Sequence, residues 1–196
     1  MSPARARTSR SDIIAAARDL LEDGGLDAVS MAAVAARVGV RPPSLYKHFG
    51  DRDALIGAVA TQASVELGDA CTAAVESAGP DPTARLQALA IAYRVRAVAH
   101  PRATALLFAG IAPAATPTPE SQTEAARPVL DVVASIVGPA RALSAARVLT
   151  AFAHGVTSME AAGAFRFGGD VDEAYRFGVA VLTAGLEREG ATPTRS

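Results

Sequence analysis

Tryptophan is absent from this 196-residue sequence, and aromatic residues make up only 5% of it. A chain with so few large rings builds its core from smaller side chains, and alanine, the strongest helix former, supplies much of the apolar content here. Hydrophobic residues account for 50% and charged residues for 20%, which is typical of a globular chain and not of a disordered one. We therefore expect an all-α protein with a substantial core.

Cysteine is nearly absent as well. The single cysteine, Cys71, excludes an intrachain disulfide and fits a reducing compartment. The first apolar run, at residues 13–17, is interrupted by Arg18 and Asp19, so it does not resemble a secretory signal. No stretch approaches the roughly 20 apolar residues of a membrane span. These absences predict a cytoplasmic protein with no membrane partner.

Patterns that carry common chemistry are also missing. The three histidines, His48, His100 and His154, stand on separate segments without a cysteine or acidic partner at metal-ligand spacing. Neither the phosphate-binding pattern G-x-x-x-x-G-K-[ST] nor the dinucleotide-binding pattern G-x-G-x-x-G occurs. We therefore expect no metal, no cofactor and no catalytic residues, and the sequence does not predict an enzyme.

Helical periodicity, interrupted by glycine and proline, divides the chain into about nine helices with no convincing strand. The expected helices cover about residues 10–23, 31–38, 42–48, 52–77, 82–99, 102–109, 120–137, 140–165 and 170–188. Three prolines between residues 111 and 119 predict a mobile loop, and Pro128 predicts a kink. We expect a three-helix domain over residues 1–56 and a helical-bundle domain over residues 57–196.

The segment from residue 27 to residue 49 carries the most specific pattern. Two short helices are joined by a turn at Gly39, and their apolar side chains can lock the pair against the first helix. This is helix-turn-helix packing, in which the second helix enters the DNA major groove. Its outward side chains include donors suited to phosphates and base edges. The predicted DNA-contacting residues are Arg10, Ser30, Arg41, Pro43, Ser44, Tyr46, Lys47, His48 and Arg52.

Basic residues extend this surface toward the N-terminus. The formal net charge is only −1, yet the first ten residues carry Arg5, Arg7 and Arg10 and no acidic residue. A basic arm on a nearly neutral chain suits a partner that touches one end of the molecule. We expect the arm to follow the DNA backbone or to enter the minor groove.

The order of these residues resembles the N-terminal domain of TetR-family repressors over about residues 9–56. The resemblance rests on Ile13 to Ala17, Leu20-Leu21, Gly25, Val29 to Met31, Val34-Ala35, Val38 to Val40, Leu45 to Phe49 and Arg52 to Leu55. It implies recognition by the helix from about Pro42 to His48, with phosphate contacts from Tyr46, His48 and Arg52. It also implies dimerisation through the last two helices and an inducer pocket in the C-terminal domain. Pro42-Pro43 departs from the small residues or glycine usual in the family at these positions. Pro43 has no N–H to offer DNA, but its ring suits contact with a thymine methyl group.

Small residues recur at helical spacing on the last two helices. Such stripes permit close contact, so two helix hairpins can form a four-helix dimer interface, although the same residues also suit packing within one chain. The predicted interface comprises Ala151, Gly155, Ser158, Ala162, Ala174, Gly178, Val181, Leu182 and Gly185. The stretch Ala153 to Gly155 further resembles a Trp-His-Gly subgroup of the family, although its tryptophan is missing.

Apolar and polar residues of the middle helices form the predicted effector pocket. The apolar side chains suit either a cavity lining or a filled core, and the polar neighbours suit the orientation of a ligand. The candidates are Tyr93, Arg96, His100, Leu106, Phe108, Phe152 and Met159.

These observations predict a homodimeric, ligand-responsive transcriptional repressor. Its partners are a double-stranded DNA operator and a small-molecule effector that releases the protein from DNA. Two alternatives remain open. The first is a constitutive DNA-binding protein with a filled core and no ligand, and the second is a small helical enzyme that carries the helix-turn-helix by descent. Stabilisation by a bound compound separates the first from the prediction, and a convergent cluster of ionisable groups separates the second.

Overall fold

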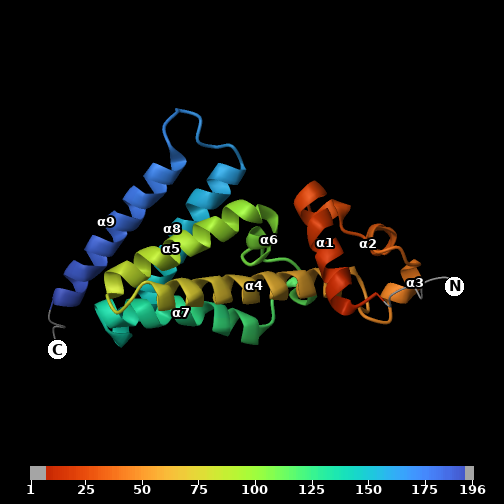
Figure 1. Cartoon of the computed structure of the whole chain (residues 1–196), viewed down its shortest axis with the longest axis horizontal. Helices are drawn as coiled ribbons and strands as arrows, with labels where there is room; N and C mark the ends of the chain where they lie inside the picture. Colours follow the sequence, from red (N-terminus) through yellow and green to blue (C-terminus); the bar gives the residue numbers. More distant parts are fainter. Residues whose placement is uncertain (1–7, 193–196) are drawn as a thin grey trace. The chain divides into compact units, whose positions relative to one another are not determined.

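The computed structural model describes residues 8–192, and every regular element within that range is helical. The α-helices of these residues are α1 (Arg10–Gly24), α2 (Met31–Arg37), α3 (Pro42–Leu45), α4 (Arg52–Ser77), α5 (Pro82–Ala99), α6 (Pro101–Leu106), α7 (Pro119–Val137), α8 (Pro139–Ala161) and α9 (Val171–Ala191) (Figure 1). Two short 3-10 helices lie between them, at Leu26–Ala28 and Pro113–Ala115. The all-α prediction is confirmed for the described residues, whereas Arg5 and Arg7 of the predicted arm lie outside them.

Packing divides the described residues into two compact units. The first comprises residues 8–64 and 102–119, and the second comprises residues 65–101 and 120–192. The sequence places a domain boundary at residue 56, where the helix-turn-helix pattern ends, and this functional division stays a prediction. The packing units follow another criterion, because the first half of α4 and the segment after α5 share a core with α1, α2 and α3.

The first unit is built around one apolar core. Ile13 on α1, Val34 on α2, Leu45 on α3 and Leu55 on α4 are almost fully buried in it, and α6 adds Leu106. Burying a side chain of this size stabilises a fold by about 1.5–3 kcal/mol. The three short N-terminal helices are therefore held to one another and to α4 by their inward faces, which leaves their outward faces available.

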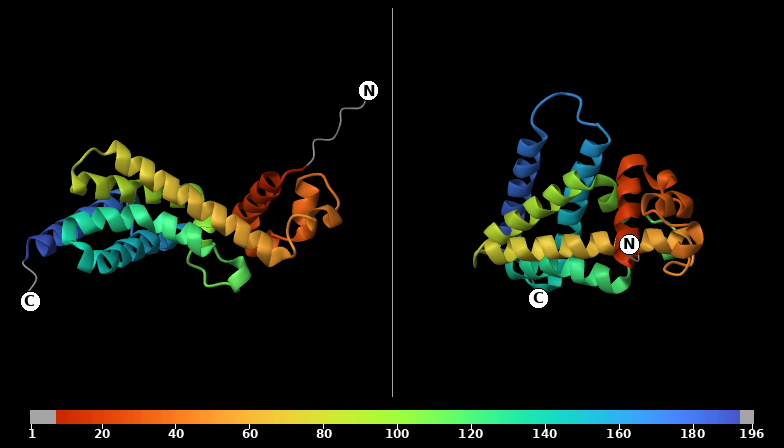
Figure 2. Two further views of the ribbon diagram at one scale, coloured as in Figure 1. Left: turned by 90° about the horizontal axis from the view of Figure 1, so that it is seen from below. Right: turned by 45° about the vertical axis from the view of Figure 1, so that its right-hand side comes forward.

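The second unit contains two apolar clusters. One includes Leu86 of α5, Val133 of α7 and residues of α8, and the other joins α5, α8 and α9 through Ala153 and Tyr175. Figures 1 and 2 show α8 and α9 as a hairpin whose connecting loop spans residues 162–170. The last two helices thus pack partly on their own unit.

The recognition segment is a shorter helix than predicted. α3 ends at Leu45, and the residues up to His48 continue as a turn instead of a regular helix. The Leu45 carbonyl accepts hydrogen bonds from the N–H groups of His48 (2.8 Å) and Phe49 (3.0 Å). This tighter winding is common at helix ends. It also accompanies the burial of Phe49 in the same core as Leu45.

The penultimate helix also ends earlier than predicted, at Ala161 instead of residue 165. Gly163 adopts a φ of 64°, a left-handed conformation that favours glycine. The N–H groups of Gly163 and Ala164 then donate to the carbonyls of Glu160 and Met159, which caps the last turn of α8. α7 includes Pro128 within its bounds, and the kink expected at this residue stays a prediction.

The proline-rich segment between residues 111 and 119 is packed, contrary to the prediction of a loose loop. It forms a 3-10 turn at Pro113–Ala115, and Ala115 is fully buried. Gly57 of α4 lies so close to the Ala114 carbonyl oxygen that a Cβ atom at position 57 would overlap with it. The N–H of Thr118 donates to Thr61 Oγ1 (3.2 Å). The segment is therefore attached to the first half of α4.

Among residues 8–192, no helix combines the length and the apolar character that crossing a membrane requires. In the same range, no three histidine, cysteine or acidic side chains are grouped so that they could hold a metal ion.

Candidate nucleic-acid interface and effector unit

The turn between α2 and α3 determines how the recognition segment is presented. Ser30 caps α2 by accepting a hydrogen bond from the Ala33 N–H (3.1 Å). Gly39 ends the helix with a φ of 72°, and the Val40 N–H donates to the Ala35 carbonyl (2.9 Å). This left-handed cap reverses the chain within a few residues. The short sequence between the two helices therefore sets a defined helix-turn-helix angle.

α3 and the turn after it have one buried face and one exposed face. Leu45 and Phe49 point into the core, whereas Tyr46 is 54% exposed and Lys47 and His48 are also exposed. The exposed side of this segment carries most of the predicted contact residues, namely Arg41, Pro43, Ser44, Tyr46, Lys47 and His48. An amine, a phenol, an imidazole and a hydroxyl thus share one outward surface, which suits phosphate and base-edge contacts.

Arg10 lies against the end of the recognition segment. Its guanidinium stacks over the Phe49 ring, 4.3 Å from the ring centre, and it donates to the His48 carbonyl (3.3 Å). A cation over an aromatic face contributes about 0.5–1 kcal/mol at an exposed site. Arg10 therefore helps to hold the turn in place, a role that the sequence does not predict, while its DNA contact stays a prediction.

Arg52 connects the start of α4 to the chain between α1 and α2. Its Nε donates to the Val29 carbonyl (2.6 Å), and its Nη2 donates to the Leu26 carbonyl (2.5 Å). A planar guanidinium offers its N–H donors to two carbonyls in a fixed fork, a geometry that the compact ammonium of lysine does not reproduce. Arg52 is thus occupied by bonds within the first unit, although it was predicted as a phosphate contact.

The substitution Arg52→Ala separates these two roles. We expect it to lower the free energy of unfolding by about 1–2 kcal/mol, because two charged hydrogen bonds are lost at a half-exposed site, and Arg52→Lys should recover little of that loss. Denaturant unfolding measures the effect. A direct phosphate contact predicts the opposite pattern, with unchanged stability and a salt dependence of DNA binding that falls by about one unit of slope.

The predicted dimer residues divide between exposed and internally packed positions. Ala151, Ser158, Ala162 and Ala174 are exposed, and a Cβ added at Gly155 or Gly185 would meet open space. Large apolar side chains also remain exposed on α9, where Phe177 is 71% and Val181 is 51% exposed. In contrast, Gly178 gives room to the ring of Phe152, and Leu182 packs on the apolar cluster of α5, α7 and α8. Gly178 and Leu182 therefore pack within their own chain, which is the alternative that the sequence left open.

The predicted pocket residues do not form a single cluster in the structure. Tyr93 and Phe152 belong to the apolar cluster of α5, α8 and α9, whereas Leu106 is buried in the core of the first unit. Phe108 and Met159 are exposed. Of the two remaining candidates, Arg96 pairs with Glu66 and His100 ends α5. The effector pocket therefore stays a prediction.

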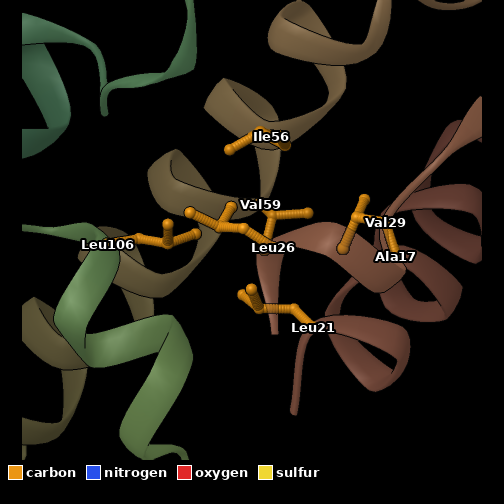
Figure 3. A pocket seen from close by; sticks show the side chains of 7 residues that line it. All are labelled: Ala17, Leu21, Leu26, Val29, Ile56, Val59 and Leu106. Atoms are coloured by element: carbon orange, nitrogen blue, oxygen red, sulfur yellow. The ribbon is translucent and has the colours of Figure 1, made fainter. Parts of the chain in front are cut away.

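A pocket does lie beside Leu106, but its lining is entirely apolar. Figure 3 shows the side chains that surround it, from Ala17, Leu21, Leu26, Val29, Ile56, Val59 and Leu106. The space is too small for a water molecule. It is a packing gap in the core of the first unit and does not suit a ligand.

Polar side chains gather beside Tyr93 in the second unit, and His154 was not among the predicted pocket residues. The Tyr93 hydroxyl lies 3.4 Å from His154 Nδ1, and the Ser158 hydroxyl lies 3.3 Å from His154 Nε2. Burial raises the pKa of Tyr93 above its usual value and lowers the pKa of His154. Burial also raises the pKa of the nearby Cys71 thiol to about 11. At neutral pH these groups are uncharged, and they lie beside the apolar cluster of α5, α8 and α9.

The lowered pKa of His154 predicts a dependence of stability on pH. Because the unfolded chain binds this proton more readily than the folded one, the contribution of His154 is present above its ordinary pKa of 6.5 and is lost as the pH falls toward the folded value. We expect the melting temperature to fall more between pH 7 and pH 5 in the unmodified protein than in His154→Gln. Thermal unfolding at both pH values measures this, and equal falls would contradict it.

A second polar cluster joins α5, α8 and α9 around a buried arginine that sequence analysis did not single out. Arg94 is only 8% exposed. Its Nη1 and Nη2 donate to Glu160 (2.7 and 3.1 Å), and its Nε donates to Asp172 (2.6 Å). The guanidinium also lies over the Tyr175 ring, 5.0 Å from the ring centre. These contacts fasten the end of α8 and the start of α9 to α5.

Two family models match the chain. Residues 13–59 match the model described as bacterial regulatory proteins of the tetR family, and residues 86–182 match the model of a tetracyclin repressor-like C-terminal domain. The first match contains the helix-turn-helix, and the second extends from α5 into α9. The finer resemblance to a Trp-His-Gly subgroup stays a prediction.

Individual relatives cover almost the whole chain. It is 27% identical to the uncharacterized HTH-type transcriptional regulator YobS of Bacillus subtilis over 95% of this chain and 96% of that protein. A solved structure of a protein of unknown function from Rhodococcus sp. RHA1 is 31% identical, with a TM-score of 0.77 over 95% and 97% of the two chains. A variant of TetR from Acinetobacter baumannii AYE, solved in complex with minocycline, is 26% identical, with a TM-score of 0.72 over 94% and 99%.

Proposed function

Because the chain belongs to the TetR family of DNA-binding transcriptional regulators, we propose that it is a homodimeric repressor that a small molecule releases from its operator. As such it acts in the cytoplasm, where the bacterial chromosome lies. The observation that carries the proposal is the exposed donor surface of Tyr46, Lys47 and His48 on a helix-turn-helix whose inner face is buried. A rigid segment with outward donors is what entry into the major groove requires.

The proposed DNA contacts fall into two groups. Pro43, Ser44 and Lys47 lie on the recognition segment and are assigned to base edges and nearby phosphates, while Tyr46 and His48 are assigned to phosphates. Arg10 and Arg52 lie at the margin of this surface and already make internal hydrogen bonds. We therefore assign the greater share of the binding energy to the recognition segment.

A dimer follows from the geometry of operators. One helix-turn-helix reads a half-site, and two copies related by a twofold axis read an inverted repeat. Regulators of this family act as dimers. Exposed Phe177 and Val181 on α9, together with the open space at Gly155 and Gly185, support a dimer face on α8 and α9. Exposed apolar side chains of this kind are typical of the core of a homodimer interface.

Ligand response is supported by the relative that binds minocycline and by the neutral polar site around Tyr93 and His154. A hydroxyl, an imidazole and an apolar surrounding can orient a mostly apolar molecule that carries a few polar groups. The ligand shifts the protein away from DNA only when it binds the non-DNA arrangement more tightly than the DNA-bound one. A constitutive regulator without a ligand remains the alternative.

Selection of bound sequences from a random DNA pool tests the DNA-binding part of the proposal. We expect enrichment of an inverted repeat, with its half-sites about one helical turn apart, and sedimentation should show an even number of chains on it. Absence of an enriched repeat would contradict the proposal. Thermal-shift measurements with apolar, ring-containing compounds, minocycline included, test the ligand part. Release of bound DNA by a stabilising compound is expected, whereas failure of every compound to stabilise the protein would favour the constitutive alternative.

A further inference from the structure

The C-terminal end of α1 and the N-terminal end of α6 are joined by reciprocal hydrogen bonds within the first unit. The Glu22 carboxylate accepts from the backbone N–H groups of Arg102 (3.1 Å) and Ala103 (2.9 Å). In return, the Arg102 guanidinium donates to the carbonyls of Glu22 (2.5 Å) and Leu21 (3.4 Å). We refer to these four hydrogen bonds as the α1–α6 clasp.

The clasp satisfies groups that neither helix satisfies alone. The first N–H groups and the last carbonyls of a helix have no partner inside it, and they favour an acidic and a basic side chain respectively. α6 has no acidic residue in its first turn, and α1 has no basic residue in its last turn. Each helix therefore receives from the other the charged group that its own sequence lacks.

The position of the clasp along the chain connects it to the second unit. The chain passes between the two units three times, at residues 64/65, 101/102 and 119/120. The second passage falls at Arg102 itself. The first residue of this segment in the first unit is therefore hydrogen-bonded to α1. α1 shares its core with α2 and α3, which carry the recognition segment. The clasp therefore lies in the same unit as the recognition segment and directly at a passage of the chain into the second unit.

We propose that Glu22 and Arg102 are positioning residues that fix the placement of the DNA-reading helices for binding to two half-sites. Without the clasp, α6 and α1 keep only their apolar contacts in the core of the first unit, and the passage at Arg102 holds the recognition segment less firmly. Binding to a full operator then falls, because simultaneous engagement of both half-sites depends on their geometry. Binding of one half-site persists, since neither residue belongs to the recognition surface. The proposal rests on the dimeric operator binding proposed above and adds the residues that align it.

The test compares a full inverted-repeat duplex with a duplex that holds a single half-site, using the full chain. We expect Glu22→Ala and Arg102→Ala to lower full-site affinity by about tenfold while half-site affinity changes by less than about twofold. Glu22→Gln should recover part of the loss, because its amide oxygen still accepts a hydrogen bond. Asp19→Ala is the matched control, since it removes an exposed negative charge from the same helix. Amide exchange at Arg102 and Ala103 should accelerate in Glu22→Ala and not in Asp19→Ala.

Equal losses on both duplexes would overturn the proposal, because they would mean that the clasp only supports folding of the first unit. Unchanged affinities in both variants would also overturn it. If the unmodified protein does not prefer the full site, the dimeric operator model fails, and this inference fails with it. If the unmodified protein and both alanine variants prefer the full site over the half-site equally, only the positioning role of the clasp is refuted. Circular dichroism spectra of all variants identify any that do not fold. If one alanine variant does not fold, the full-site and half-site affinities of the other alanine variant test the proposal.

Discussion

Substitution of Lys47 by alanine is expected to weaken operator binding by about tenfold and to reduce the slope of log affinity against log salt by about one. Lys47 is exposed on the recognition segment and is the only lysine of the chain. Loss of an ammonium that meets a phosphate removes one released counterion, and loss of a base-edge contact removes specificity as well. Because the side chain makes no contribution to the core, the melting temperature should remain unchanged.

Tyr46→Ala should produce a loss of similar size without the change in salt slope, since a neutral phenol displaces no counterion. The double variant should lose about one hundredfold if the two contacts are independent. Electrophoretic mobility-shift titrations at several salt concentrations measure both quantities. Arg176→Ala, at an exposed position on α9, serves as the matched control for loss of a positive charge. If the control and Lys47→Ala weaken binding equally, the effect reflects net charge and the assigned surface is wrong.

The helix-turn-helix could be predicted from sequence because short-range chemistry determines it. Ser30 caps its own helix three residues ahead, and Gly39 adopts the left-handed conformation that the turn needs. Both signals lie within a few residues of the structure that they specify. The alternation of buried Leu45 and Phe49 with exposed neighbours was equally visible in the pattern. The fold of the N-terminal helices and the exposure of the recognition segment were therefore predictable.

Contacts between distant residues were not predictable in the same way. Arg52 looks like a free cation in the sequence, because nothing local indicates that carbonyls 23 and 26 positions earlier lie within its reach. The Glu22 and Arg102 contacts span about 80 positions and appear only when two helix ends meet. Likewise, the proline-rich segment looks mobile in the sequence. In the structure its backbone packs against α4 at Gly57, where the absence of a side chain leaves room for it. Periodicity predicts which face is buried but not which element covers it.

Arg94 is the clearest case of such a distant contact, and its replacement is expected to have the largest effect on stability. Its partners Glu160 and Asp172 lie 66 and 78 positions away in the sequence. We expect Arg94→Met to lower the free energy of unfolding by about 3 kcal/mol, because removing one member of a buried ion pair leaves the other uncompensated. For a chain of this length the melting temperature should fall by roughly 10 °C. Arg94→Lys should recover little, since an amine cannot reproduce the forked contacts.

A double substitution distinguishes the ion pair from simple packing. When both Arg94 and Glu160 are replaced by methionine, no unpaired Glu160 carboxylate remains, so much of the stability should return. Asp172 is more exposed than Glu160, so its unpaired carboxylate is screened by water and costs less. Denaturant unfolding of the two single variants and the double variant forms a complete cycle. If the loss of unfolding free energy in the double variant equals the sum of the losses in the two single variants, the charges are not coupled. The loss would then come from the stacking of Arg94 on Tyr175 and from its buried stem.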